Sequence, residues 1–307
     1  MRLLIVGSGG VGGYFGAKLA KAGVDVTLLA RGAHLAAIKR NGLTIRSAVE
    51  GDWTVQVNAV DDVSGLPSPD IILFCVKSFD TESAAELVAP IVGPDTGVIS
   101  LQNGIDNEDK ISRVVGAGHA MGGVAYVFSS IAEPGVIAHQ QFGKIVFGEL
   151  SATTSERSEA FRAACEKASI PVQLSADVQK ALWQKFIYQA AQGGTTAVTR
   201  LPIKYLREVP ETRALWLMQI EELLAISVKA GIRFDTDFIE KATAFVEGLD
   251  PTNTSSLYQD LVSGRRIELD AFHGHAIERG AKLGVPTPTL TAVDAALRPH
   301  LNGAPTA

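Results

Sequence analysis

The chain has 307 residues, 46% of them hydrophobic and 20% charged, which is typical of a globular protein with one large or two medium domains. Its net charge of −5 argues against nucleic acid or an anionic membrane as a partner, because both favour a basic surface. The two cysteines match neither a disulfide framework nor a metal-binding spacing, and no apolar run reaches membrane-spanning length. We therefore expect a cytoplasmic protein without a metal site.

The first half of the chain alternates short apolar runs with helical patterns. The runs occupy residues 2–7, 25–30, 70–76 and 97–102, and further β-rich stretches follow at 120–128 and 143–150. Continuous apolar strands separated by helices predict a doubly wound parallel sheet covered on both faces.

The strand pattern disappears near residue 176. Amphipathic helical segments follow, at 211–231 and 267–284, and each ends at a glycine. We therefore predict an α/β domain over residues 1–175 and an all-helical domain over residues 176–307.

A glycine loop follows the first predicted strand and opens the first predicted helix. Gly7 permits a tight turn, Gly9 lets the backbone approach a pyrophosphate, and Gly12 lets the helix pack closely. A glycine-rich turn without a ligand would show the same spacing, but the strand–turn–helix context is the one that a dinucleotide site requires. The predicted cofactor-binding residues of the loop are Gly7, Ser8, Gly9, Gly10, Val11 and Gly12.

The residue after the second strand distinguishes the two nicotinamide dinucleotides. NAD-binding chains carry an acid there, whereas this chain has Arg31 and no carboxylate between Thr27 and Ala48. A guanidinium grips a 2′-phosphate that a carboxylate would repel. The pattern favours NADP(H) as cofactor, although an exposed charge at a helix start would look the same.

Lys185 is the only charged residue in the segment 181–199. Gln189 and Gln192 lie four and seven residues further on, so the three side chains share one face of an otherwise apolar helix. Such a polar stripe is typical of a helix that lines a cleft. A lysine that reaches solvent, or that pairs with a distant acid, would show the same spacing.

The chain resembles the ketopantoate reductase (2-dehydropantoate 2-reductase) family over nearly its whole length. The resemblance rests on the glycine loop, on Arg31 in "LLAR", Lys77 in "CVKS" and Asn103 in "LQNGI", and on the segments "ALWQKF" and "NTSSLYQDLVSGRRIELD". The last segment is the most specific, because Ser256 and Glu268 stand twelve residues apart, as the family's serine and glutamate do. The resemblance implies a Rossmann domain, a helical carboxyl-terminal domain and NADPH-dependent reduction of a 2-oxo acid in pantothenate biosynthesis.

The resemblance also implies residue roles that are chemically reasonable. Hydride arriving at a ketone carbon leaves negative charge on the oxygen, which Lys185 would stabilise and protonate. Glu268 would orient Lys185 or hold a hydroxyl group, the alternative being an acid that stabilises a helix N-terminus. Ser256 would donate to the substrate carboxylate, although a serine in this place is as often a helix cap.

Two further residues follow predicted strands, at the sheet edge where open α/β folds bind ligands. Lys77 and Asn103 are expected to meet the nicotinamide end of the cofactor, and Asn103 also the substrate.

The chain departs from the family in its substrate-binding positions. The family carries asparagines four and eight residues after the lysine, where this chain has Gln189 and Gly193, and a third asparagine is replaced around Pro202-Ile203. Gln189 keeps an amide with a longer reach, whereas Gly193 has no side chain. Because lost polar partners change selectivity strongly, the substrate is less certain than the reaction type.

Three other interpretations remain open. The chain could be a paralogue that reduces a different branched 2-oxo acid, a β-hydroxyacid dehydrogenase, or a non-catalytic NADP-sensing module. Arg31 and the Ser256–Glu268 spacing favour the reductase, and a sensor would need no lysine and glutamate in a second domain. The carboxyl-terminal helices could also form a homodimer face, but no patch can be located from sequence.

Overall fold

The computed structural model describes residues 1–305, and the chain divides into two compact units. Unit 1 comprises residues 1–102 and 106–181, and unit 2 comprises residues 103–105 and the chain from residue 182 onward. The change of unit falls within one long helix, α6 (Val178–Thr199), a few residues beyond the predicted boundary near residue 175.

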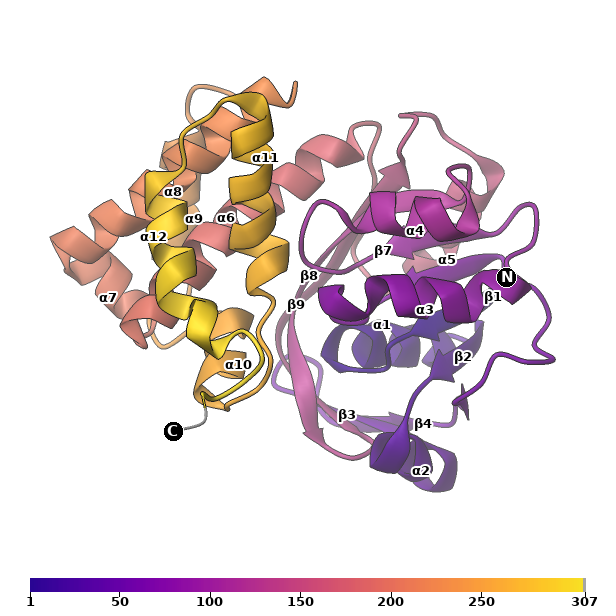
Figure 1. Cartoon of the computed structure of the whole chain (residues 1–307). Helices are drawn as coiled ribbons and strands as arrows, with labels where there is room; N and C mark the ends of the chain where they lie inside the picture. The colour runs from indigo at the N-terminus through magenta and orange to yellow at the C-terminus, as the bar shows by residue number, and fades with distance from the viewer. Residues whose placement is uncertain (306–307) are drawn as a thin grey trace. The chain divides into compact units, whose positions relative to one another are not determined.

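Unit 1 contains the β-sheet (Figure 1). Its strands are β1 (Arg2–Val6), β2 (Asp25–Leu29), β3 (Leu43–Ser47), β4 (Trp53–Val55), β5 (Asn58–Val60), β6 (Ile71–Phe74), β7 (Gly97–Ser100), β8 (Ala120–Glu133), β9 (Val136–Glu149) and β10 (Val172–Leu174).

The strand order is β4-β3-β9-β8-β7-β6-β1-β2-β5, with β10 paired to β9. The central strands β5, β2, β1, β6, β7 and β8 all run parallel to their neighbours within this group. The β8–β9 and β3–β4 pairs are antiparallel, so the sheet as a whole is mixed.

Helices cover the sheet on both faces. Those of unit 1 are α1 (Gly10–Lys21), α2 (Gly32–Asn41), α3 (Thr81–Val88), α4 (Asn107–Val115) and α5 (Glu156–Lys167), with short 3₁₀ turns at Ser78–Asp80 and Ala89–Ile91.

The alternation of β1 shows why the sheet is buried on two sides. Leu3 and Ile5 belong to the hydrophobic cluster that includes residues of α1 and α5, whereas Leu4 and Val6 belong to the cluster that includes residues of α3 and α4. Successive side chains of a strand point to opposite faces, so an uninterrupted apolar strand needs a helix layer on each side.

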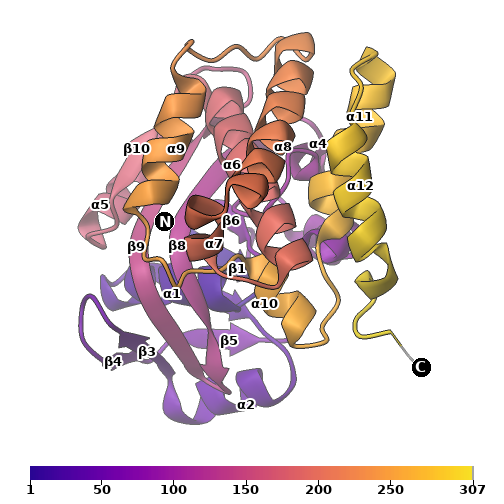
Figure 2. The same ribbon diagram turned by 90° about the vertical axis from the view of Figure 1, so that its left-hand side faces the viewer.

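Unit 2 is helical (Figure 2). In addition to the greater part of α6 it contains α7 (Ile203–Glu208), α8 (Pro210–Lys229), α9 (Phe238–Gly248), α10 (Ser256–Val262), a π-helical turn (Asp270–Gly274), α11 (His275–Leu283), α12 (Pro288–Leu297) and a 3₁₀ turn (Arg298–His300). Its main core is aromatic and aliphatic, with Trp216 and Phe186 almost fully buried.

The predicted fold class is confirmed: the chain combines a Rossmann-type α/β sheet with a helical carboxyl-terminal part. The two β-rich stretches predicted at 120–128 and 143–150 are arms of one long hairpin. The strands β3, β4 and β5 were not predicted, because they have only three to five residues and lie among polar residues. Within residues 1–305, no helix has the length and apolar character needed to cross a membrane.

Candidate active site

The glycine loop is tightly packed at both ends and open in the middle. Gly7 has a φ of +95°, and a Cβ there would lie 2.8 Å from the backbone of Cys75 and Val76. A Cβ on Gly12 would lie 2.1 Å from the carbonyl oxygen of Gly7, whereas a Cβ on Gly9 would meet nothing within 4 Å. The first and third glycines are therefore needed for packing, and the space at Gly9 fits the approach of a phosphate group.

Gly10 has a separate steric reason. A Cβ on Gly10 would lie 2.3 Å from the carbonyl oxygen of Ser129, so α1 begins against strand β8. Ser8 is buried, and Val11 packs against the core on the α1 side. The contact between Gly10 and β8 was missed in the sequence analysis, since the signal is only one extra glycine in the loop.

Arg31 lies between β2 and α2, in extended backbone conformation. Its side chain is 87% exposed, and one guanidinium nitrogen lies 3.8 Å from a carboxylate oxygen of Asp80. An exposed pair at this distance contributes little stability, so Arg31 is held only weakly. The sequence has no acid near Arg31, but the fold brings Asp80 to it from the turn after β6.

Lys77 also follows β6 and precedes the 3₁₀ turn at Ser78–Asp80. The neighbouring carboxyl-terminal loops of β6 and β7 are tied together by Gln102, whose Nε2 donates to the carbonyl oxygen of Val76 at 3.2 Å and to Oγ1 of Thr81 at 2.8 Å. The half-buried Lys77 thus starts from a well-anchored backbone.

Asn103 groups with unit 2 although it follows strand β7. Its Nδ2 lies 3.5 Å from Oε2 of Glu268, a hydrogen bond at the long limit. Glu268 is 5% exposed and immediately precedes the helical segment that begins at Leu269. Two of the residues expected at the reacting centre therefore lie together.

Lys185 and Gln189 stand one turn apart on α6, and both are half-buried. The same helix face continues to Gly193, where an added Cβ would lie 3.6 Å from Leu257, the residue that follows Ser256. The row that begins at Lys185 therefore leads to the start of α10.

The serine that caps α10 is Ser255. Its Oγ accepts a hydrogen bond from the backbone N–H of Tyr258 at 3.0 Å, and Thr196 of α6 lies 2.8 Å from the same Oγ. Ser256 is exposed and is the first residue of the helix. The capping role considered for Ser256 thus belongs to its neighbour.

A buried polar network holds α6 in place on another side. Gln219 of α8 donates from Nε2 to Oγ1 of Thr195 at 2.9 Å, and its Oε1 lies 3.0 Å from Nε2 of His273 in the π-helical turn. A Cβ on Gly194 would lie 2.5 Å from Oε1 of Gln219 and 2.5 Å from Nε2 of His273. Gly194 therefore lets α6 approach the turn that follows Glu268.

The electrostatics of His273 are those of a core residue. Burial lowers the pKa of His273 to about 4, with a smaller contribution from the charge of Arg298. Because Oε1 of Gln219 can only accept, Nε2 of the neutral His273 ring carries the hydrogen and donates it. His273 was not among the predicted residues, because a histidine in a helical pattern gives no signal of its own.

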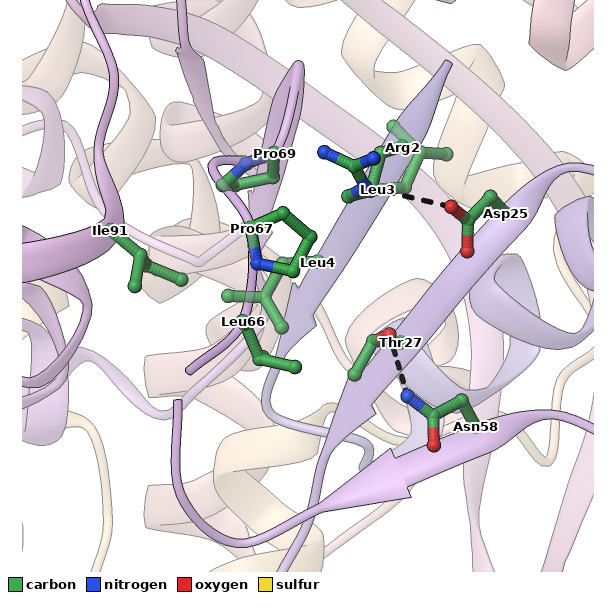
Figure 3. Close-up of a pocket in the computed structure, with 10 residues that line it drawn as sticks. All are labelled: Arg2, Leu3, Leu4, Asp25, Thr27, Asn58, Leu66, Pro67, Pro69 and Ile91. Carbon is green, nitrogen blue, oxygen red and sulfur yellow. Dashed lines mark hydrogen bonds and ion pairs between the residues drawn. The ribbon is translucent and has the colours of Figure 1, made fainter. Parts of the chain in front are cut away.

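The pocket in Figure 3 lies elsewhere in unit 1. It surrounds the first residues of β1 and β2, where Arg2 lies 3.6 Å from Asp25 and Asn58 donates to Oγ1 of Thr27 at 3.0 Å. The crossover from β5 to β6, which borders this pocket, is an irregular loop containing Pro67. The predicted cofactor-binding residues instead follow the carboxyl ends of the strands.

A dinucleotide-type glycine loop on a doubly wound sheet, combined with a lysine-bearing helix in a second unit, defines a class of two-unit oxidoreductases. The sequence profile described as "Ketopantoate reductase PanE/ApbA" matches residues 3–152, and its carboxyl-terminal counterpart matches residues 177–300. The chain belongs to the ketopantoate reductase family.

Individual relatives agree with this assignment. The 2-dehydropantoate 2-reductase of Aquifex aeolicus is 31% identical, covering 94% of this chain and 93% of its own, and that of Pyrococcus horikoshii is 30% identical, covering 94% and 93%. A PanE/ApbA family ketopantoate reductase from Ralstonia eutropha superposes with a TM-score of 0.90 at 33% identity, covering 98% of each chain. A D-mandelate dehydrogenase solved with NADH shares the fold, with a TM-score of 0.89 at 20% identity.

Proposed function

We propose that this protein reduces 2-dehydropantoate (ketopantoate) to pantoate with NADPH, as a step of pantothenate biosynthesis. The observation that carries the proposal is the row Lys185, Gln189 and Gly193 on α6, which ends against the start of α10, next to Ser256. One helix face thus offers an ammonium and an amide, and leads to a serine hydroxyl. The names of the Aquifex and Pyrococcus relatives support ketopantoate as the substrate.

Residues 1–175 would form the NADP-binding domain and residues 176–307 the substrate domain. The glycine loop would hold the pyrophosphate, with the open side at Gly9 facing it, and Arg31 would hold the 2′-phosphate. Lys77 and Asn103 would meet the nicotinamide end. When bound, NADPH supplies the hydride that is added to the carbonyl carbon of the substrate.

Lys185 would act as the general acid. As the carbon–hydrogen bond forms, the carbonyl π-electrons move to oxygen, and the Nζ of Lys185 gives that oxygen its proton and later regains one from water. Glu268, 3.5 Å from the amide of Asn103, would orient Lys185 or hold a hydroxyl group. The hydroxyl of Ser256, which does not serve as the cap of α10, would donate to the substrate carboxylate.

A turnover assay tests the proposal. NADPH oxidation would be measured with ketopantoate, with the same branched 2-oxo acid lacking the hydroxyl group, and with a bulkier aromatic 2-oxo acid. Ketopantoate is expected to give the highest kcat/KM. A higher value for another 2-oxo acid would favour a paralogue with a different substrate.

The same experiment separates the other candidates. Oxidation of a β-hydroxyacid by NADP⁺, with no reduction of any 2-oxo acid, would favour a β-hydroxyacid dehydrogenase. Tight NADPH binding with no turnover at all would favour a sensing module. The cytoplasmic location and the homodimer remain predictions. Cys75 and Cys165 form no disulfide, and Cys165 is buried.

A further inference from the structure

His34 joins three segments of unit 1 that lie far apart in the sequence. It is the third residue of α2, and its Nε2 lies 2.9 Å from the carbonyl oxygen of Ser8 in the glycine loop. Its Nδ1 lies 3.0 Å from the backbone nitrogen of Gly135, in the turn between β8 and β9. One imidazole therefore connects the glycine loop, the helix after Arg31 and the tip of the long hairpin.

The two contacts determine which ring nitrogen carries the proton. The N–H of Gly135 is a donor, so Nδ1 accepts, and Nε2 must then carry the hydrogen that it donates to Ser8. Burial lowers the pKa of His34, opposed by the bond to the Ser8 carbonyl. The ring is thus a neutral imidazole with one tautomer.

The bond to Ser8 also determines the direction of the next N–H group. The carbonyl of Ser8 and the N–H of Gly9 belong to one trans peptide, in which they point in opposite directions. Because His34 draws the carbonyl toward α2, the N–H of Gly9 points away from α2. A Cβ on Gly9 would meet nothing within 4 Å, so this residue lies at the open part of the loop.

The close backbone contacts of the loop occur at its other glycines. Gly7, Gly10 and Gly12 are each pressed against neighbouring backbone, whereas Gly9 is not. The Ser8–Gly9 peptide is therefore the part of the loop where a hydrogen bond can decide the orientation. A reversed peptide would present a carbonyl oxygen to an anion and repel it.

We propose that His34 is a positioning residue that orients the Ser8–Gly9 peptide so that its N–H group faces the cofactor pyrophosphate. The proposal rests on the proposed function, because it assumes that the glycine loop binds a dinucleotide. It assigns His34 to the pyrophosphate alone, which NADPH and NADH share, and not to the 2′-phosphate.

The test is the dissociation constant of each dinucleotide, measured by fluorescence titration of the full chain. His34→Ala is expected to weaken NADPH and NADH by the same factor, roughly 5- to 50-fold, because a buried carbonyl loses its donor. Binding of 2′-AMP, which has the 2′-phosphate but no pyrophosphate, should stay within about twofold. At saturating NADPH, kcat should also stay within about threefold of the unmodified protein.

Two controls make the result specific. His119→Ala removes another histidine of unit 1 whose ring lies 2.8 Å from a backbone carbonyl, that of Thr96, and it should leave both dinucleotides unaffected. His34→Gln keeps an N–H donor for Ser8 and should restore most of the affinity. This second variant also decides the question if His34→Ala fails to fold.

The outcomes are distinct. Unchanged affinity in His34→Ala, an equal loss of 2′-AMP affinity, or an equal loss in His119→Ala would overturn the positioning role. If the unmodified protein bound neither dinucleotide, the proposed function itself would fail, and that result would appear before any variant was compared.

Discussion

The two units build their parts of the candidate site in different ways. In unit 1 the glycine loop works through backbone geometry, since Gly7 and Gly12 pack against main-chain atoms and Gly9 is open. In unit 2 the candidate residues are side chains on α6, and their helix is held by buried hydrogen bonds from Gln219. The backbone geometry of the loop requires glycines at particular positions. The side chains on α6, in contrast, are positioned by residues that are far away in the sequence.

Adjacent glycines of α6 illustrate the second case. A Cβ on Gly193 would make ordinary contact with Leu257 at 3.6 Å, but one on Gly194 would lie 2.5 Å from Gln219 and His273. The two residues look identical in the sequence. Of the two, only Gly194 is needed for packing, so a side chain can be added at Gly193 without a steric clash.

The largest effect is expected at Lys185. It would show that proton transfer depends on a side chain of unit 2. Lys185→Ala should lower kcat by about 10²- to 10⁴-fold, because the developing charge on oxygen loses its acid. NADPH affinity should remain near that of the unmodified protein, as measured by fluorescence titration. Lys229→Ala, in the last turn of α8, is the matched control and should be neutral. Near-normal turnover in a folded Lys185→Ala protein would remove the lysine from the mechanism.

The next effect concerns the substrate, and its test adds a side chain at Gly193, where there is space for one. The alternative to the proposed substrate is a pocket reshaped by Gln189 and Gly193. In that case ketopantoate would have a kcat/KM about 5- to 150-fold below that of a better branched 2-oxo acid, because its hydroxyl lacks a partner. Gln189→Asn with Gly193→Asn should then raise activity on ketopantoate.

A neighbouring substitution provides the control. Gly194→Asn should unfold or strongly destabilise the protein, because its side chain would collide with the Gln219–His273 pair. If the unmodified protein already prefers ketopantoate by a wide margin, the altered-pocket hypothesis is wrong.

The sequence predicted the structure correctly where it depends on a residue's own conformation or on a helix period. The glycine spacing, the apolar strands and the long helices α6 and α8 are of this kind. It failed where the partner is remote: Asp80 beside Arg31, His34 beside Ser8, and Gln219 beside His273 come together only in the folded chain. Short strands such as β4 were missed because their pairing, and not their own three residues, makes them strands.

A substitution of Arg31 tests whether a side chain of unit 1 also contributes to cofactor selectivity. Arg31→Ala should weaken NADPH about 10- to 100-fold and leave NADH nearly unchanged, because a charge-assisted contact to the 2′-phosphate is lost. Asp80→Asn should have the opposite tendency and favour NADPH slightly, since it removes the carboxylate 3.8 Å from the guanidinium. Equal losses of both cofactors in Arg31→Ala would exclude it from the phosphate site.

The smallest effect on the reaction is expected from two buried titratable groups, one in each unit. They should affect stability in opposite directions as pH changes. Burial raises the pKa of Glu108, in the first turn of α4, to about 8, and the nearby charges of Asp106 and Asp109 act in the same direction. Burial lowers the pKa of His273 in unit 2 to about 4. Each group is neutral in the folded protein near pH 6, one as a protonated acid and the other as a deprotonated base.

The two groups give opposite pH dependence. The unfolded chain releases the proton of Glu108 near pH 4.5, so its contribution to the free energy of unfolding is lost as pH rises from there to about 8. His273 contributes stability above pH 6.5, and this is lost as pH falls toward 4.

Glu108→Gln should therefore raise the urea midpoint at pH 8 more than at pH 5 and leave kcat unchanged. Glu86→Gln, the same substitution at an exposed position of α3, is the matched control. If Glu108→Gln shifted the midpoint equally at both pH values, the pKa of Glu108 would not be raised in the folded protein. The two units would then not differ in the pH dependence of their stability.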